Sequence, residues 1–233
     1  MSRSATGRAR AVISGVGRPD YSFGIVLSLI LLTLGFQVAA PEEQWARFVI
    51  LTMHGIVLLS ALLAARANRA IVGAALVAVV TALVVSGFAL VGPGELNEVP
   101  AAVVNALFIG VTPVIVARGL IHELREERTV TIRTMFGVLC IYLLIGVFFA
   151  FVYAVIDAET ANEFFPHVAP ASTSDFLYFS FTTLTTTGYG DLVTVNELGR
   201  SMAVLEALIG QIYLVTVVAL IVANMRRPAR ASD

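Results

Sequence analysis

Long apolar runs, separated by short polar segments, dominate the pattern of hydrophobic and polar positions along the chain. A helix needs about 20 apolar residues to cross the hydrocarbon core of a membrane. The pattern therefore predicts an all-α membrane protein with six membrane-spanning helices. We place these helices at residues 21–40, 45–65, 70–91, 99–116, 134–156 and 198–225.

The stretch between the fifth and sixth predicted spans differs from the other connections. Ser172 and Asp175 have the spacing of an N-terminal capping box, and an aromatic run follows at residues 176–181. The helix expected over residues 172–185 is too short to span a bilayer. Irregular backbone is tolerated at membrane depth only where protein buries it or where it lines a watery cavity. We therefore expect a re-entrant helix, followed by a segment that lines a pore.

The arginines between the apolar runs predict the orientation of the chain. Basic segments stay in the cytoplasm, and arginines precede the first predicted span and follow the second, fourth and sixth. Both termini are therefore expected in the cytoplasm, with residues 1–20 as the N-terminal segment and residues 226–233 as a short tail. Residues 119–133 mix arginine with glutamate and are expected to form a cytoplasmic linker helix.

Composition excludes several classes of protein. Hydrophobic residues make up 58% of the chain and charged residues 13%, so most of its surface must face lipid. The net charge of −1 gives no basic face for nucleic acid, and no arrangement typical of an enzyme site or of a soluble substrate is present. Cys140 has no partner for a disulfide or a metal site. The polar residues His54 and Asn105 are expected to hydrogen-bond neighbouring helices.

The segment after the re-entrant helix reads Thr-Thr-Gly-Tyr-Gly at residues 186–190, and Asp191 follows. It resembles the Thr-Val-Gly-Tyr-Gly selectivity filter of the potassium channel family, and the helices on both sides match that family in order and spacing. The resemblance covers the expected pore module, residues 134–225. It implies a homotetramer, in which three identical subunits complete the pore of each chain, and no cofactor other than K⁺ ions in the filter. K⁺ would bind at Thr186, Thr187, Gly188 and Tyr189.

Dehydration explains these residue types, because a K⁺ ion entering a narrow filter must exchange its water for carbonyl oxygens. Gly188 and Gly190 can adopt positive φ, which lets successive carbonyls face one axis. Thr186 would complete the innermost ring of oxygens, and Tyr189 would pack against the aromatic re-entrant helix. The C-terminal end of that helix, near Leu184, would favour a cation through its partial negative charge.

Several residues are expected to support the filter from behind: Tyr178, Thr182, Thr183, Thr185 and Asp191. Thr187 stands where the family usually has Val, so its hydroxyl needs a polar partner. Thr182 occupies the position of a glutamate that pairs with the filter aspartate in two-helix bacterial members. Tyr178 is placed to offer its hydroxyl to Asp191 instead. Phe179 stands where many members have Trp.

Three residues of the last span are candidates for a gate or sensor, each with an alternative. Glu206, a carboxylate deep in a span, is either a protonated or hydrogen-bonded structural residue or a proton-sensitive gate. Gly210 aligns with the family's hinge glycine but equally suits close helix packing. Gln211 either hydrates an ion in the cavity or bonds a neighbouring helix.

Residues 21–118 form an expected four-helix membrane domain in the position of a voltage sensor. Its last span, residues 99–116, contains no arginine, so weak or no voltage gating is expected. The sequence thus predicts a potassium-selective channel for passive K⁺ flux across the plasma (inner) membrane of a bacterium, with lipids as its surroundings. The alternatives are a weakly selective or non-selective monovalent cation channel and, third, a cation transporter subunit, although no internal repeat is visible.

Overall fold

A computed structural model describes residues 23–91, 99–127, 131–160, 163–166, 168 and 170–225. The regular elements in this part of the chain are helices. They are α2 (Phe23–Ala39), α3 (Gln44–Ala64), α4 (Arg69–Val91), α5 (Val99–Glu127), α6 (Ile132–Glu159), α7 (Thr173–Leu184) and α8 (Glu197–Met225). The predictions for residues 1–20 and for the tail 226–233 concern residues outside the described part of the chain.

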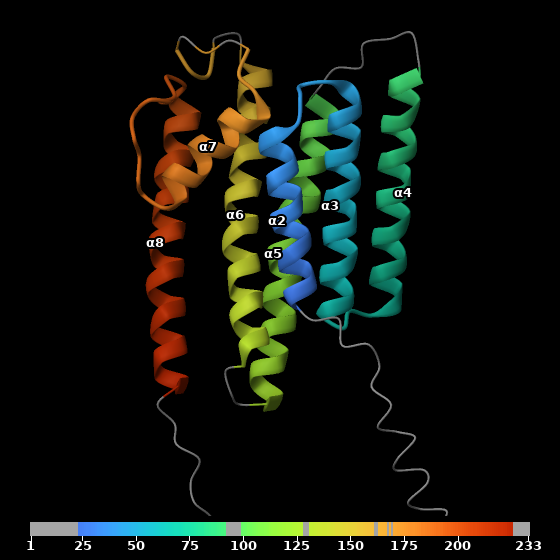
Figure 1. Ribbon diagram of the computed structural model, residues 1–233, viewed down its shortest axis with the longest axis vertical. Coiled ribbons are helices and arrows are strands. Elements are labelled where there is room, and N and C mark those ends of the chain that lie inside the picture. The colour runs from blue at the N-terminus through green and yellow to red at the C-terminus, as the bar shows by residue number, and fades with distance from the viewer. Residues whose placement is uncertain are drawn as a thin grey trace, which may run out of the picture.

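The long helices run side by side, and the short helix α7 lies tilted at one end of the bundle, near α6 and α8 (Figure 1). Helix α6 is the central element, because it packs against α2, α5, α7 and α8. Helix α2 begins and α8 ends at the end of the bundle opposite α7 (Figure 1). Phe23 and Met225, the first and last residues of these helices, thus lie at the same end of the bundle.

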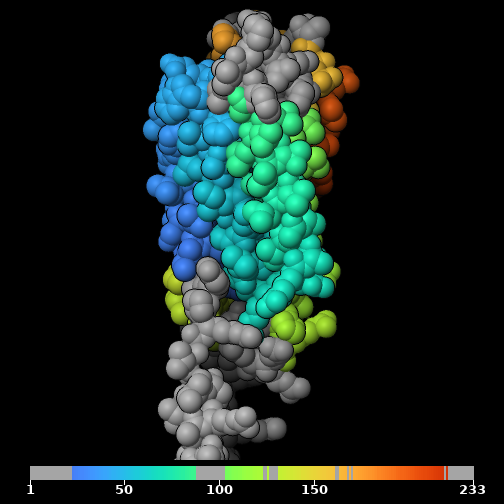
Figure 2. Space-filling model, turned by 90° about the vertical axis from the view of Figure 1, so that its right-hand side faces the viewer, coloured from blue at the N-terminus to red at the C-terminus, as the bar shows by residue number. Residues whose placement is uncertain are grey.

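Within the described residues, five helices are long and apolar enough to cross a membrane: α3, α4, α5, α6 and α8. Helix α2 is equally apolar but has 17 described residues, so the length of the first expected span is not reached there. Helices α4 and α8 expose many large apolar side chains; Figure 2 shows the side on which α4 lies. Such faces in a single chain are suited to lipid or to other subunits.

The linker expected at residues 119–133 is divided between two longer helices. Helix α5 continues to Glu127, because the apolar periodicity persists past its expected end and Leu120 is buried. Helix α6 begins at Ile132, after Thr131 caps its first turn. The short connection makes α5 and α6 neighbours within one chain. Within one chain, α2 and α5 therefore pack on α6.

Polar residues buried among the first helices bond to one another, as expected. The ring of His54 lies between Gln37 and Asn105, with 2.8 Å from its Nε2 to Gln37 Nε2 and 2.8 Å from its Nδ1 to Asn105 Oδ1. These contacts join α2, α3 and α5. The thiol of Cys140 is buried and donates to the carbonyl of Phe23, which agrees with a packed, unreactive cysteine.

Candidate functional site

Helix α7 begins where the capping pattern predicted. The hydroxyl of Ser172 accepts from the backbone N–H of Asp175 at 3.2 Å, and the Asp175 carboxylate accepts from the Ser172 N–H at 2.9 Å. The helix has 12 residues, which at 1.5 Å each gives roughly 18 Å, too short to span a bilayer. Its expected range, residues 172–185, consists of these residues and their two caps.

A second carboxylate reaches the start of α7 from the loop between α2 and α3. Glu42 accepts from the backbone N–H of Thr173 at 2.8 Å and lies 4.0 Å from the guanidinium of Arg47. Negative charge at a helix N-terminus is favourable, because the first N–H groups there have no partner within the helix. No signal in the sequence pointed to this link, because Glu42 and Thr173 lie 131 residues apart along the chain.

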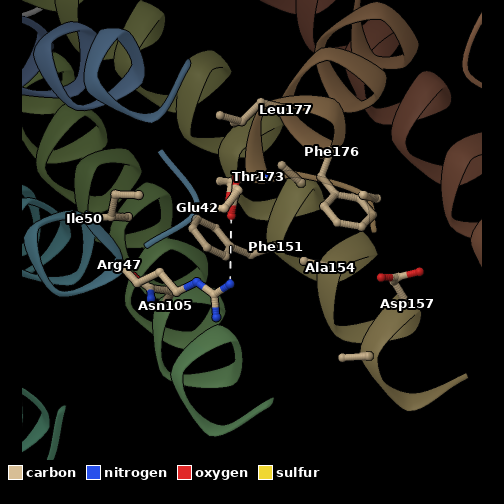
Figure 3. A pocket seen from close by; sticks show the side chains of 13 residues that line it. Glu42, Arg47, Ile50, Asn105, Phe151, Ala154, Asp157, Thr173, Phe176 and Leu177 are labelled. Atoms are coloured by element: carbon tan, nitrogen blue, oxygen red, sulfur yellow. Dashed lines mark hydrogen bonds and ion pairs between the residues drawn. The ribbon is translucent and has the colours of Figure 1, made fainter. Parts of the chain in front are cut away.

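Beside this link lies a cavity of about 140 Å³ between the four-helix domain and α6 and α7. Figure 3 shows Arg47 and Asn105 on one side of it, and Phe151 and Asp157 of α6 on the other. Its walls combine charged and aromatic side chains. The two parts of the chain are thus joined by Glu42 at this end but are incompletely packed there.

An aromatic cluster fixes α7 against α6 and against the loop that precedes it. Phe164 and Phe165 of that loop are fully buried and contact Phe176 and Phe179 of α7 with ring centroids 5.2 to 6.0 Å apart. Tyr153 of α6 lies edge-on to Phe179 at 5.0 Å. Phe179, at the position where the family often has Trp, is therefore a core residue between α7 and α6.

In the backbone after α7, residues with positive φ alternate with residues that do not have it. Thr186, Gly188 and Gly190 have φ of 56°, 50° and 82°, whereas Thr187 and Tyr189 are not among the positive-φ residues. Strand-like residues of one handedness point successive carbonyls in opposite directions, and alternating handedness brings them to one side. The positive φ of both glycines was expected. The positive φ of Thr186 was not, because a β-branched residue rarely adopts it.

The last turn of α7 holds this segment through its carbonyls. The N–H of Thr186 donates to the Thr183 carbonyl at 2.9 Å, and the N–H groups of Thr187 and Gly188 donate to the Thr182 carbonyl at 2.8 and 3.1 Å. Thr182 and Thr183 thus support the segment through backbone oxygens rather than side chains. The position of α7 therefore sets the position of the expected filter.

Side chains add further support. The hydroxyls of Thr185 and Thr187 lie 2.8 Å apart, which provides the polar partner that Thr187 was expected to need. Tyr178 donates to Asp191 at 2.8 Å, as predicted, and this hydrogen bond is the main cause that lowers the pKa of Asp191 below its ordinary value. The ring of Tyr189 stacks on that of Tyr178 with centroids 6.2 Å apart.

Helix α8 touches the segment through two neighbouring residues. The amide of Gln211 donates to the Thr186 hydroxyl at 2.7 Å, so Gln211 bonds directly to the innermost expected filter residue. Gly210 lies against the carbonyl oxygen of Leu184, which a Cβ at this position would meet. That carbonyl also lies 3.5 Å from the Tyr142 hydroxyl of α6. The contact shows close packing at Gly210.

Glu206 lies one turn before Gly210 and is fully buried. Its carboxyl contacts the Tyr153 hydroxyl of α6 at 2.6 Å and the Ser180 hydroxyl of α7 at 2.5 Å. Sequence reasoning missed Ser180 and Tyr153. The available signal for Ser180 was a small polar residue within an otherwise aromatic run.

Comparison with known proteins concerns this same part of the chain. The sequence model of a family described as "Ion channel" matches residues 137–227. The inward rectifier potassium channel Kirbac3.1 of Paramagnetospirillum magnetotacticum is 32% identical over 88 residues, which cover 38% of this chain and 28% of that protein. The chain thus spans well under half the length of this curated relative. No solved structure matches. Residues 137–227 therefore carry an ion channel domain that is similar to part of a potassium channel.

Proposed function

We propose that this chain is one subunit of a potassium-selective channel that conducts K⁺ passively across a bacterial inner membrane. The carbonyls of Thr186, Thr187, Gly188 and Tyr189 would replace the hydration water of the ion. The alternating φ at Thr186, Gly188 and Gly190 is the observation that carries the proposal, because it gives one chain a row of carbonyls on one side.

The same geometry supports a homotetramer. One row of carbonyls provides only part of a coordination shell, and the side chains of residues 185–191 are largely exposed in the single chain. Helix α8, beside that row, exposes large apolar side chains between Leu198 and Val215. Three further copies of the chain would cover these surfaces and close the ring, with six spans in each chain and both termini in the cytoplasm.

The proposed channel is not strongly voltage-gated. Steep voltage dependence needs several charges within the membrane field, each contributing about 2.3 kcal/mol per 100 mV. Residues 99–116 of α5 contain no arginine. A steep conductance–voltage curve in symmetrical K⁺ would contradict this part of the proposal.

A weakly selective monovalent cation channel is the second candidate. Among the described contacts, Tyr189 is held by stacking on Tyr178, without a hydrogen bond from its hydroxyl. Less restraint on Tyr189 would allow the outer rings to widen and Na⁺ to pass. Reversal potentials under opposing Na⁺ and K⁺ gradients separate the two candidates, because only a selective filter follows the K⁺ gradient.

The test of conduction is K⁺ flux into liposomes that contain the purified protein, compared with Gly190→Ala. Within one chain a Cβ at Gly190 meets no atom within 4 Å, so the variant acts there through the backbone preference at φ 82° and not through packing. An L-residue there costs roughly 1–2 kcal/mol, and flux should be lost without unfolding. Gly73→Ala in α4 is the matched control, since its Cβ also meets nothing and its φ is ordinary. Equal flux in both variants would refute the assignment.

A further inference from the structure

Helices α6, α7 and α8 meet at one carboxyl group. Among the described residues, Glu206 of α8 is the one acidic residue that is buried, and it has no exposed surface. Its Oε2 lies 2.6 Å from the Tyr153 hydroxyl, and its Oε1 lies 2.5 Å from the Ser180 hydroxyl. The same Ser180 oxygen lies 2.6 Å from the carbonyl oxygen of Gly146. These three short oxygen–oxygen contacts therefore form one continuous series from Tyr153 through Glu206 and Ser180 to Gly146.

The number of protons that the contacts require decides whether Glu206 is protonated. Each of the three contacts is short enough to require a hydrogen between the two oxygens, because bare oxygens repel at that distance. Tyr153 and Ser180 have one hydroxyl proton each, and the Gly146 carbonyl has none. The third proton must then belong to Glu206. With it, Tyr153 donates to Oε2, the Glu206 carboxylic acid donates to Ser180, and Ser180 donates to Gly146.

The surroundings agree with a neutral acid. The described hydrogen-bond partners of the Glu206 carboxyl are two neutral hydroxyl groups. The ionisable groups that face it are Tyr153 and, farther away, Tyr142, both from α6. On α7, the Tyr178 hydroxyl bonds Asp191, and Asp175 bonds the cap residue Ser172. An isolated buried carboxylate would be very costly, whereas a hydrogen-bonded acid is not.

These contacts matter for the proposed filter because Ser180 lies only two and three residues before Thr182 and Thr183, whose carbonyls anchor it. Gly146 lets α7 approach α6 closely, since a Cβ there would lie 2.9 Å from the ring of Phe181. The carbonyls of Thr182 and Thr183, in the last turn of α7, accept from the backbone N–H groups of Thr186, Thr187 and Gly188. The contacts that hold Ser180 against α6 and α8 therefore also set the position of the Thr182 and Thr183 carbonyls relative to those helices.

We propose that Glu206 is a positioning residue that works as a neutral carboxylic acid, its proton joining α8 to Ser180 and so holding α7 in the place that keeps the filter conducting. Only the positioning role in this proposal rests on the proposed channel function; the protonation of Glu206 does not. If Glu206 loses its proton, the Glu206 carboxylate and the Gly146 carbonyl compete for the single hydroxyl proton of Ser180. The helix that anchors the filter is then released from one of its two neighbours.

Infrared difference spectroscopy of the reconstituted protein tests the proton directly. At neutral pH, the wild type should show the carbonyl stretch of a protonated carboxylic acid, and Glu206→Gln should lack it. Glu197→Gln, at the exposed start of the same helix, is the matched control and should leave the band unchanged. A wild type without the band, or a band that persists in Glu206→Gln, overturns the proposal whether or not the protein conducts.

Flux as a function of pH tests the positioning role. The amide of Glu206→Gln can donate to Ser180 and accept from Tyr153, so this variant should conduct like the wild type at neutral pH. The wild type should lose flux as alkaline pH removes the proton, in step with the infrared band, and the variant should not. Glu206→Leu, which has no donor, should conduct on the order of tenfold less, as for one lost hydrogen bond to a buried group.

The infrared and flux measurements together distinguish a wrong channel function from a wrong positioning role. If the wild type carries no K⁺ at any pH while the infrared band is present, the channel function fails and the neutral acid stands. If the wild type conducts but Glu206→Gln, correctly folded, does not, the positioning role is wrong. The same holds if Glu206→Gln loses flux at alkaline pH together with the wild type.

Discussion

Substitution of Gly210 distinguishes a hinge from a packing contact, because the two roles predict opposite signs for stability. If Gly210 served only as a bending point, Ala would stabilise α8 by about 1 kcal/mol through its helix propensity. In the structure, however, a Cβ at position 210 meets the carbonyl oxygen of Leu184, and its next neighbour, a methyl carbon of the Leu184 side chain, lies at 3.0 Å. We therefore expect Gly210→Ala to destabilise the protein.

The magnitude follows from what the new methyl group meets. Overpacking in a well-packed site costs typically 1–3 kcal/mol, and the upper value applies where the obstacle is backbone that cannot rotate away. The Leu184 carbonyl belongs to the last turn of α7, whose Thr182 and Thr183 carbonyls also accept hydrogen bonds from the backbone that follows. Subtracting the propensity gain of about 1 kcal/mol leaves a net loss of about 2 kcal/mol.

Thermal unfolding of the purified protein in one detergent, at one protein concentration and scan rate, is the assay. Gly73→Ala and Gly35→Ala are controls within α4 and α2, because a Cβ at either position meets nothing within 4 Å. Both should raise the transition temperature, while Gly210→Ala lowers it. A rise in all three variants would refute close packing at Gly210 and favour the hinge.

Two further predictions concern the ends of the filter. Tyr178→Phe keeps the ring that stacks on Tyr189 but removes the hydrogen bond to Asp191. Because that bond lowers the pKa of Asp191, its contribution is present at neutral pH and is lost as pH falls through the lowered pKa. Acid inhibition of K⁺ flux should therefore begin at a higher pH in the variant, and coincident acid profiles would contradict this. Gln211→Leu removes the donor to the strained Thr186, so the K⁺ to Na⁺ permeability ratio from reversal potentials should fall rather than stay constant.

Local features of the chain could be predicted from sequence because they depend on residues close together along it. The cap of α7 by Ser172 and Asp175 needs only a three-residue spacing. The positive φ of Gly188 and Gly190 follows from the missing Cβ and the need for carbonyls on one side. The hydrogen bond from Tyr178 to Asp191 also joins residues of one short stretch.

Contacts between distant segments were decided only by the tertiary structure. Glu42 caps α7 across the boundary between the two parts of the chain, and Glu206 meets Tyr153 and Ser180 from two other helices. Gln211 was left between two roles until α8 placed it against Thr186.

Apolar periodicity determined by itself that this chain is a bundle of membrane helices with one short helix among them, since water and lipid act on each segment separately. Which side chains meet between those helices depends on their rotation and depth, and packing of the whole bundle sets both. The proton on Glu206 is therefore a property of three helices together, because no single segment contains all of its partners.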